Sequence, residues 1–481
     1  MALLAFLWVT QKGRFPYPFT DNEGDLACLA SQWASGVNRD TWTLNPIRFL
    51  PLALLARFIP LTDYVLHLYV LAVHWAVALL LVALARRWGW GWNSAWVSAV
   101  AYALLVLSPL FLPWTADSDL LMQPWLLAAF WAASSRSRAG WFGSGILFGL
   151  AFLSKPSALF FIPVEVVLLG WKDWARMRWA LAGAGLALTP GWLLLLWTGP
   201  GGFLSEGRVY FSGAYFWSGW RYLIHTIWYR RWLVNWLDWV LLVYALPLGV
   251  LLFKRFYLRR QNDGRPLVLW AGAALVSASV SGYFFSYYFM SLIPPLALAF
   301  GEWVEKTPKK NSPVLRWGLL AALGLESAWL ALPPVRHRLF LASQYDPVRY
   351  CEARQMGMDL RVWARPGDRL MAWTNSPQLY AYSGLPLGVV ENRFINQLIW
   401  LPRERAALEG RFRKNPPRFF ILRDSLEVIP PPDWLRLAVK RGYRLKESMG
   451  GLELFSRHQS PHLSRETHVY QTPILRKTIL K

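Results

Sequence analysis

The segment from Tyr64 to Ala85, YVLHLYVLAVHWAVALLLVALA, decides the fold class of this chain. It contains no Asp, Glu, Lys or Arg, and it reaches the roughly 20 apolar residues that a helix needs to cross the core of a bilayer. We therefore predict a membrane-spanning helix here. Its two histidines, His67 and His74, are seven residues apart and lie on one helical face. Because metal-binding pairs usually sit three or four residues apart, we interpret both as core or interface residues.

The composition extends this interpretation to the whole chain. Of the 481 residues, 55% are hydrophobic and 16% are charged, whereas soluble globular proteins have about 25% charged residues. The 31 Trp are typical of a membrane protein, because the Trp ring favours the two bilayer interfaces. The net charge of +23 would indicate nucleic acid in a soluble protein. Here we assign it to loops that face the cytoplasm and lipid headgroups, and we expect no nucleic-acid partner.

Other apolar segments resemble further spans, although several are shorter than a full crossing. They are Trp92 to Phe111, Asp119 to Ala133, Trp141 to Leu153, Ala158 to Trp171, Trp179 to Trp197, Trp236 to Phe253, Pro266 to Gly282, Phe285 to Val304 and Val314 to Pro334. We predict a polytopic α-helical membrane protein with about 10–12 transmembrane helices. The apolar start, Met1 to Thr10, is about half a span long. Either this helix is shortened or its true start lies upstream.

Basic residues in every second loop predict the orientation. They are Arg86-Arg87, Arg136 with Arg138, Lys172 with Arg176 and Arg178, Lys254-Arg255 with Arg259-Arg260, and Lys306 with Lys309-Lys310. Cytoplasmic loops carry an excess of Lys and Arg, so these loops face the cytoplasm of a cell (inner) membrane. The opposite face then holds the loop from Gly199 to Asn235 and everything after Val335.

From about Val335 the spans end and a different pattern begins. Arg369 to Trp373 and Arg418 to Leu422 read as strands after turn residues, and Pro402 to Phe412 reads as a helix that begins with proline. We predict a transmembrane domain over residues 1–334, an extracytoplasmic α/β domain over 335–457, and a disordered tail over 458–481. Cys28 and Cys351 are the only cysteines, and we expect no disulfide between them.

An acidic cluster, Asp21-Asn22-Glu23-Gly24-Asp25, precedes the spans on the predicted outer face. Acidic side chains at a membrane border carry an energetic penalty, so their presence there indicates a function. The alternative is a polar loop whose carboxylates cap a helix.

The chain resembles the GT-C superfamily of membrane glycosyltransferases, and within it the bacterial protein mannosyltransferase and aminoarabinose transferase-like group. The stretches that carry the resemblance occur in family order. They are Asp21-Asn22-Glu23-Gly24-Asp25-Leu26-Ala27-Cys28-Leu29-Ala30, Asp119-Leu120-Leu121-Met122, Gly149-Leu150-Ala151-Phe152-Leu153-Ser154-Lys155-Pro156 and Tyr287-Tyr288-Phe289-Met290-Ser291-Leu292-Ile293-Pro294-Pro295. The resemblance implies transfer of a sugar, with inversion, from a polyprenyl-phosphate donor to an extracytoplasmic glycan, lipid or protein. Membrane lipids are expected partners, and a requirement for a divalent metal stays open.

A carboxylate suits the general base of this reaction, because it accepts the proton of the attacking hydroxyl. Because Asn22 interrupts the family's usual Asp-Glu pair, either Asp21 or Glu23 can be the equivalent acid, and we take Asp21 first. The alternative for both is capping of the helix from Leu26 to Trp33. Asp25 is better placed for that cap, so we assign it a structural role. Asp117 is interpreted as a solvated loop residue.

The donor phosphate needs positive charge, and Lys155 is the first candidate because the family uses the matching lysine near the lipid phosphate. The alternative for Lys155 is snorkelling to the interface. Arg48, Arg208 and Arg221 are further candidates for phosphate binding, since arginine binds phosphate oxygens bidentately; their alternative is headgroup contact.

The substrate pocket has three candidate residues. Asp119 can orient the acceptor or a loop arginine, or stabilise its own helix N-terminus. Tyr287 and Tyr288 can line a sugar pocket or belong to an interfacial aromatic belt.

Two other kinds of function compete with the enzyme. A transporter or lipid flippase should show broken helices or internal pseudo-symmetry, which we do not find in the sequence. A catalytically inactive GT-C-like assembly subunit remains an alternative because of the interrupted Asp-Glu pair.

Overall fold

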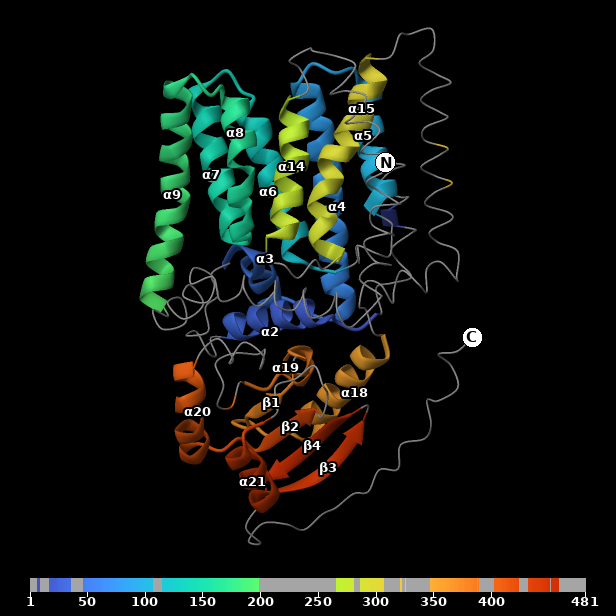
Figure 1. Cartoon of the computed structure of the whole chain (residues 1–481). Coiled ribbons are helices and arrows are strands. Elements are labelled where there is room, and N and C mark those ends of the chain that lie inside the picture. Colours follow the sequence, from blue (N-terminus) through green and yellow to red (C-terminus); the bar gives the residue numbers. More distant parts are fainter. Residues whose placement is uncertain are drawn as a thin grey trace, which may run out of the picture.

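The computed structural model has an upper bundle of helices and a lower α/β domain, and the helices α2 (Asp21–Ser35) and α3 (Pro46–Ala56) lie between the two (Figure 1). It describes residues 7–8, 17–35, 46–106, 115–198, 265–280, 286–306, 321, 325, 347–374, 376–386, 388, 402–423, 431–449 and 451–457. The predicted span Trp236 to Phe253, most of Val314 to Pro334, and the tail after Arg457 lie outside these residues.

The bundle helices run side by side in Figure 1. They are α4 (Asp63–Arg87), α5 (Trp92–Val106), α6 (Ser118–Ala133), α7 (Arg138–Ser154), η3 (Pro156–Phe161) with α8 (Ile162–Leu169), α9 (Trp174–Thr198), α14 (Arg265–Ser279), and η6 (Ser286–Leu292) with α15 (Ile293–Lys306). Each predicted span on described residues is therefore helical, and two of them begin with a 3₁₀ turn. Local chemistry sets the limits of α4. Thr62 accepts a hydrogen bond from the Val65 amide at its start, and Arg86 and Arg87 lie in its last turn.

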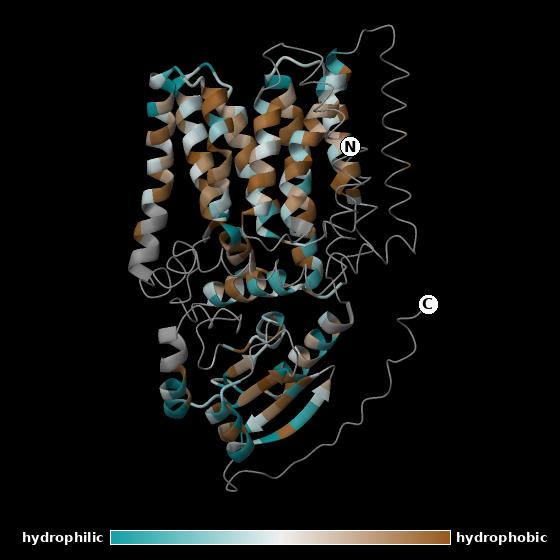
Figure 2. Ribbon diagram, viewed as in Figure 1, coloured by the Kyte–Doolittle hydropathy of each residue, from teal (hydrophilic) through white to brown (hydrophobic). Residues whose placement is uncertain are grey.

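Hydrophobic residues predominate along the bundle, whereas hydrophilic residues are frequent on α20 (Pro402–Lys414) and β3 (Tyr443–Met449) of the lower domain (Figure 2). Among the described residues, one helix, α4, is long and apolar enough to cross a membrane. Shorter apolar stretches are Ile47–Ala56, Trp92–Val106, Pro156–Leu169 and Pro266–Ser279. The predicted number of crossings therefore stays a prediction.

Three of the predicted cytoplasmic loops meet at the end of the bundle away from the α/β domain (Figure 1). The Arg87 Nε–H donates to the backbone oxygen of Ser134 at 3.2 Å, which joins the end of α4 to the loop after α6. The Arg176 guanidinium lies 5.1 Å from the ring centroid of Trp141, which joins the start of α9 to α7. Positive charge is thus gathered at one end, as the positive-inside rule requires of one membrane face.

We expect the opposite end, with the α/β domain, to lie outside the cytoplasm. A reporter fused after Arg457, the last residue of β4 (Leu452–Arg457), should be active only if it is of a type that works outside the cytoplasm. A second reporter that works only inside the cytoplasm serves as the matched control. Activity of that second reporter after Arg457 would contradict the orientation.

In the described part of the chain, the α/β domain is built on a four-stranded sheet in the order β1-β2-β4-β3. The strands are β1 (Leu370–Trp373), β2 (Phe419–Arg423), β3 (Tyr443–Met449) and β4 (Leu452–Arg457); the helices are α18 (Pro347–Trp363), α19 (Gln378–Ser383), α20 (Pro402–Lys414) and α21 (Asp433–Gly442). The β1 and β2 strands are parallel, with Leu370 opposite Phe419, and the other pairs are antiparallel. The predicted strands and the predicted helix at Pro402 are all present.

Each face of the sheet has its own apolar core, because side chains alternate along a strand. Met371, Trp373 and Phe420 pack with residues of α20 and α21. Leu370 and its neighbours on the other face pack with residues of α18 and α19, and Cys28 belongs to the same cluster. Since Cys28 lies in α2, the helix with the acidic cluster forms part of the core of the C-terminal domain.

Candidate active site

The acidic cluster forms the first turn of α2 (Asp21–Ser35), and a capping box begins that turn. The Glu23 amide donates to Thr20 Oγ1 at 3.3 Å, and the Thr20 amide donates to Glu23 Oε2 at 3.0 Å. This reciprocal pair satisfies two backbone donors that a helix start leaves without partners. Glu23 therefore caps the start of a helix, which was the structural alternative to a role as the base, and Thr20 is its partner.

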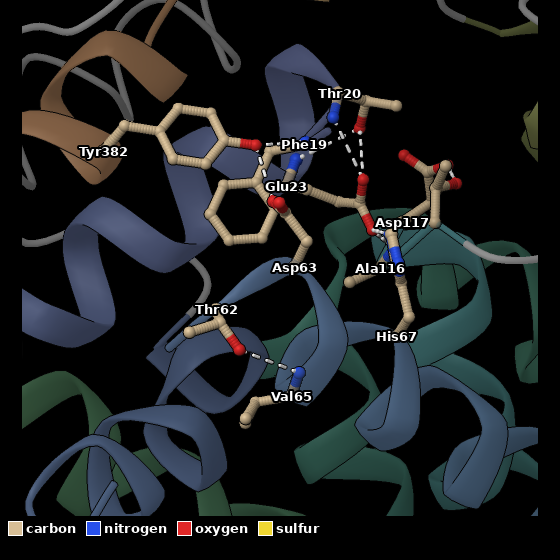
Figure 3. A network of polar contacts seen from close by, with 11 residues as sticks. Phe19, Thr20, Glu23, Thr62, Asp63, Val65, His67, Ala116, Asp117 and Tyr382 are labelled. Atoms are coloured by element: carbon tan, nitrogen blue, oxygen red, sulfur yellow. Dashed lines mark hydrogen bonds and ion pairs between the residues drawn. The ribbon is translucent and has the colours of Figure 1, made fainter. Parts of the chain in front are cut away.

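Glu23 also ties α2 to the bundle (Figure 3). Its side chain is fully buried, and its Oε1 accepts a hydrogen bond from the Ala116 amide at 3.1 Å. His67 Nε2 lies 3.3 Å from the same oxygen. His67 of α4 is buried and lies at the contact with α2, which confirms its interpretation as a core or interface residue. His74 is buried as well, with its Nδ1 2.8 Å from the Tyr102 hydroxyl.

Asp21 and Asp25 differ in their surroundings. Asp21 is the first residue of α2 and is half-buried. Asp25 is buried one turn further along, and its Oδ2 lies 2.6 Å from Nη2 of Arg48. Arg48 belongs to α3 (Pro46–Ala56), so this ion pair joins α2 to α3. The expectation that Asp25 caps the helix is wrong, because α2 begins four residues earlier; its role is structural through Arg48 instead.

Asp117 is buried, so its interpretation as a solvated loop residue is also wrong. Its carboxylate accepts hydrogen bonds from the Asn22 amide group at 2.7 Å and from the Thr115 hydroxyl at 2.6 Å. Burial raises the pKa of Asp117 to about 6, and its hydrogen-bond partners oppose that rise. Asn22, which interrupts the acidic pair in the sequence, therefore binds α2 to this loop together with Glu23.

Lys155 lies between α7 and η3, where it pairs with Asp119 at the start of α6. Its Nζ lies 4.3 Å from the ring centroid of Tyr288, within range of a cation–π contact. The Asp119 side chain is fully buried, and that of Lys155 is 15% exposed. The lysine is thus held between a carboxylate and an aromatic ring, which is a different arrangement from a side chain that snorkels to the interface.

One short segment joins the acidic turn to the lysine. Asn22 and Glu23 of α2 contact Asp117 and Ala116, and Asp119, two residues further on, pairs with Lys155. Two residues span at most about 7 Å. The first turn of α2 and the charged end of Lys155 therefore border one region where the bundle meets α2.

The remaining predicted site residues receive less support. Arg48 is paired with Asp25, as described above. Tyr287 lies in η6, and its side chain is outside the described part of the chain; Arg208 and Arg221 are outside it altogether. Within the described ranges, no group of three or more His, Cys, Asp or Glu side chains is arranged to hold a metal ion.

Comparison with known proteins gives matches in structure alone. No family model matches the chain, and no curated protein matches it by sequence. The crystal structure of ArnT from Cupriavidus metallidurans bound to undecaprenyl phosphate superposes with a TM-score of 0.66 at 13% identity, over 95% of this chain and 96% of that one. The chain has the fold of ArnT.

The apo structure of the same ArnT agrees, with a TM-score of 0.63 at 12% identity over 95% of this chain and 97% of that one. ArnT has the GT-C fold, so the GT-C fold that the resemblance implies is confirmed for this chain. The match to ArnT extends over nearly the full length of both chains, and it therefore includes the C-terminal domain as well as the bundle.

Three structural features of this region were not predicted from the sequence. The capping box had a readable signal, Thr20 followed by Glu23 three residues later. The contact between Asn22 and Asp117 joins residues 95 positions apart, and no local pattern predicts it. The same holds for Tyr382, a residue of the C-terminal domain that contacts Phe19, two residues before the start of α2 (Figure 3).

Proposed function

We propose that this protein transfers a sugar from a polyprenyl-phosphate donor to an extracytoplasmic acceptor. The observation that carries the proposal is the Lys155–Asp119–Tyr288 cluster, which adjoins the acidic turn of α2. The ArnT fold adds support, because an ArnT structure was solved with undecaprenyl phosphate bound. A few hydrogen bonds in the pocket decide which donor sugar and which acceptor such an enzyme uses.

Lys155 is our candidate for the leaving phosphate. An ammonium group has three donors, and a single ion pair with Asp119 leaves capacity for phosphate oxygens. Asp119 fixes the lysine in place, and the Tyr288 ring restricts it from the other side. A positive charge held in this way stabilises the negative charge that develops on the phosphate as the sugar departs.

Asp21 is our candidate for the general base. In the reaction, an acceptor oxygen forms a bond to the anomeric carbon, the bond from that carbon to the phosphate oxygen breaks, and the acceptor proton passes to a carboxylate. Glu23 is fully buried and is occupied by Thr20, Ala116 and His67. Asp21 is half-buried at the start of the helix, which suits a group that must meet a substrate hydroxyl.

The first test is turnover by the purified protein. Lipid-linked sugar donors that differ in the sugar should be incubated with the protein, and release of polyprenyl phosphate should be measured. We expect release from at least one donor, dependent on an added acceptor. The alternatives are a transporter or flippase and an inactive assembly subunit. Movement of the donor between leaflets without release of polyprenyl phosphate would favour a flippase, and donor binding without either event would favour an inactive subunit.

A further inference from the structure

The C-terminal domain packs closely against the acidic first turn of α2. A Cβ added to Gly24 would lie 2.4 Å from the backbone nitrogen and Cα of Gln378 in α19. A side chain at position 24 would therefore push the two helices apart. One turn further along, Cys28 is 2% exposed and packs in the core that α18, α19 and the sheet share. The helix that begins with the acidic cluster, α2, thus packs directly against the C-terminal domain.

Tyr382 of α19 makes two hydrogen bonds across this interface (Figure 3). Its hydroxyl accepts a hydrogen bond from the Phe19 amide at 2.6 Å and donates one to Asp63 Oδ1 at 2.6 Å. Its ring stacks on the Phe19 ring with centroids 4.9 Å apart. Arg354 Nη1 of α18 lies 3.3 Å from the other oxygen of Asp63. One hydroxyl thus connects the C-terminal domain, the segment that leads into α2, and the N-terminus of α4.

The protonation of Tyr382 suits this double contact. Burial and the neighbouring Asp63 carboxylate raise the pKa of Tyr382 above the usual value of a phenol. The hydroxyl therefore keeps its proton at neutral pH and donates it to Asp63. The same oxygen is then free to accept from the Phe19 amide, as the distances require.

We propose that Tyr382 is a positioning residue that fixes the entry of α2 and thereby the placement of Asp21. Phe19, whose amide Tyr382 holds, is two residues before Asp21, a distance of at most about 7 Å along the chain. Thr20, the residue between them, is the capping partner of Glu23. A shift of the Phe19 backbone would therefore reach Asp21 directly. This inference rests on the proposed transferase function, and it gives the C-terminal domain a part in the reaction.

The test compares two Tyr→Phe substitutions on the same short helix. Tyr382→Phe removes both hydrogen bonds and keeps the ring. Tyr380→Phe is the matched control, because its hydroxyl accepts from the Ala372 amide at 2.8 Å inside the C-terminal domain. We expect Tyr382→Phe to lower kcat by about tenfold, since small misplacements of catalytic groups have effects of this order or larger. The KM for the donor should stay unchanged, because Lys155 is untouched, and Tyr380→Phe should keep the wild-type kcat.

A second measurement does not depend on turnover. In a Cys351→Ser background, Cys28 is the only thiol of the chain, and its buried position makes its reaction with a maleimide slow. Tyr382→Phe should speed this labelling, and Tyr380→Phe should not. Gly24→Ala, which separates the same helices by a steric route, should speed the labelling and lower kcat as Tyr382→Phe does.

The outcomes separate the two proposals. If the wild-type protein releases no polyprenyl phosphate from any donor, the proposed function fails, while Cys28 labelling still reports on the Tyr382 contact. If the wild type is active and Tyr382→Phe has the wild-type kcat, Tyr382 is not a positioning residue, whatever the labelling rate. A loss of kcat that Tyr380→Phe reproduces would equally overturn the inference, because it would indicate a general loss of domain stability.

Discussion

Replacing Asp21 with Asn should lower turnover by about 10²- to 10⁴-fold, the usual contribution of a general base. The amide keeps the size and most of the polarity of the carboxylate but does not take up a proton at neutral pH. Donor binding should persist, because Lys155 is the residue assigned to the phosphate. The measurement is single-turnover release of polyprenyl phosphate, together with a separate measurement of donor affinity.

Glu23→Gln is the matched control for Asp21→Asn. Glutamine at the third position of a capping box still accepts a hydrogen bond from the capping residue, so α2 should form. The substitution also removes the charge opposite His67, and we therefore expect a lower unfolding temperature with turnover per folded molecule retained. An inactive Glu23→Gln beside a fully active Asp21→Asn would make Glu23 the base. If both variants keep full activity in a folded protein, the acidic turn is structural and the proposed reaction has no base.

The sequence predicts the bundle well, since apolar runs and their limits are local properties. Tyr64 to Ala85 was expected as a helix, and α4 runs from Asp63 to Arg87. Thr62 before this run and two arginines at its end are signals of helix limits that can be read without a structure. The strands at Leu370 and Phe419 were predicted in the same way, from short apolar runs after turns.

The site is harder to predict, because its contacts join distant parts of the chain. The sequence singles out Lys155 and Asp119 as candidates, yet nothing in it pairs them, since they are 36 residues apart, Lys155 just after α7 and Asp119 in the first turn of α6. Asp117 is buried because α2 folds over it through Asn22. A carboxylate in a loop is usually solvated. The burial of Asp117 results from contacts with distant residues and is visible only in the tertiary structure.

The domain boundary shows a similar limit. A division at residue 335 follows the end of the apolar spans, and it assigns α2 to the transmembrane part. In the structure, Glu23 of α2 contacts the bundle, and Cys28 packs in the core of the C-terminal domain. Hydropathy alone does not reveal a helix that both parts share. Because α2 begins with Asp21, the candidate base, contacts from both parts of the protein determine the position of that residue.

Removing Lys155 should weaken donor use by about 10²-fold, and the structure shows how to separate this effect from folding. Lys155→Ala alone leaves the Asp119 carboxylate buried without its cation, and breaking a buried ion pair in this way destabilises a protein by about 3–5 kcal/mol. A loss of activity in this variant would therefore have two explanations. Lys155→Ala combined with Asp119→Asn removes both charges and should restore most of the stability.

The double variant should unfold near the wild-type temperature and still have a kcat/KM for the donor about 10²-fold lower. That factor corresponds to the loss of a hydrogen bond to a charged group, about 1.5–3 kcal/mol. Lys155→Arg keeps the positive charge, so it should retain part of the activity, although its planar group fits differently between Asp119 and the Tyr288 ring. The measurements are thermal unfolding in detergent and kcat/KM for a polyprenyl-phosphate sugar. If the stable double variant uses the donor as well as the wild type, Lys155 serves only to neutralise Asp119, and the phosphate is bound elsewhere.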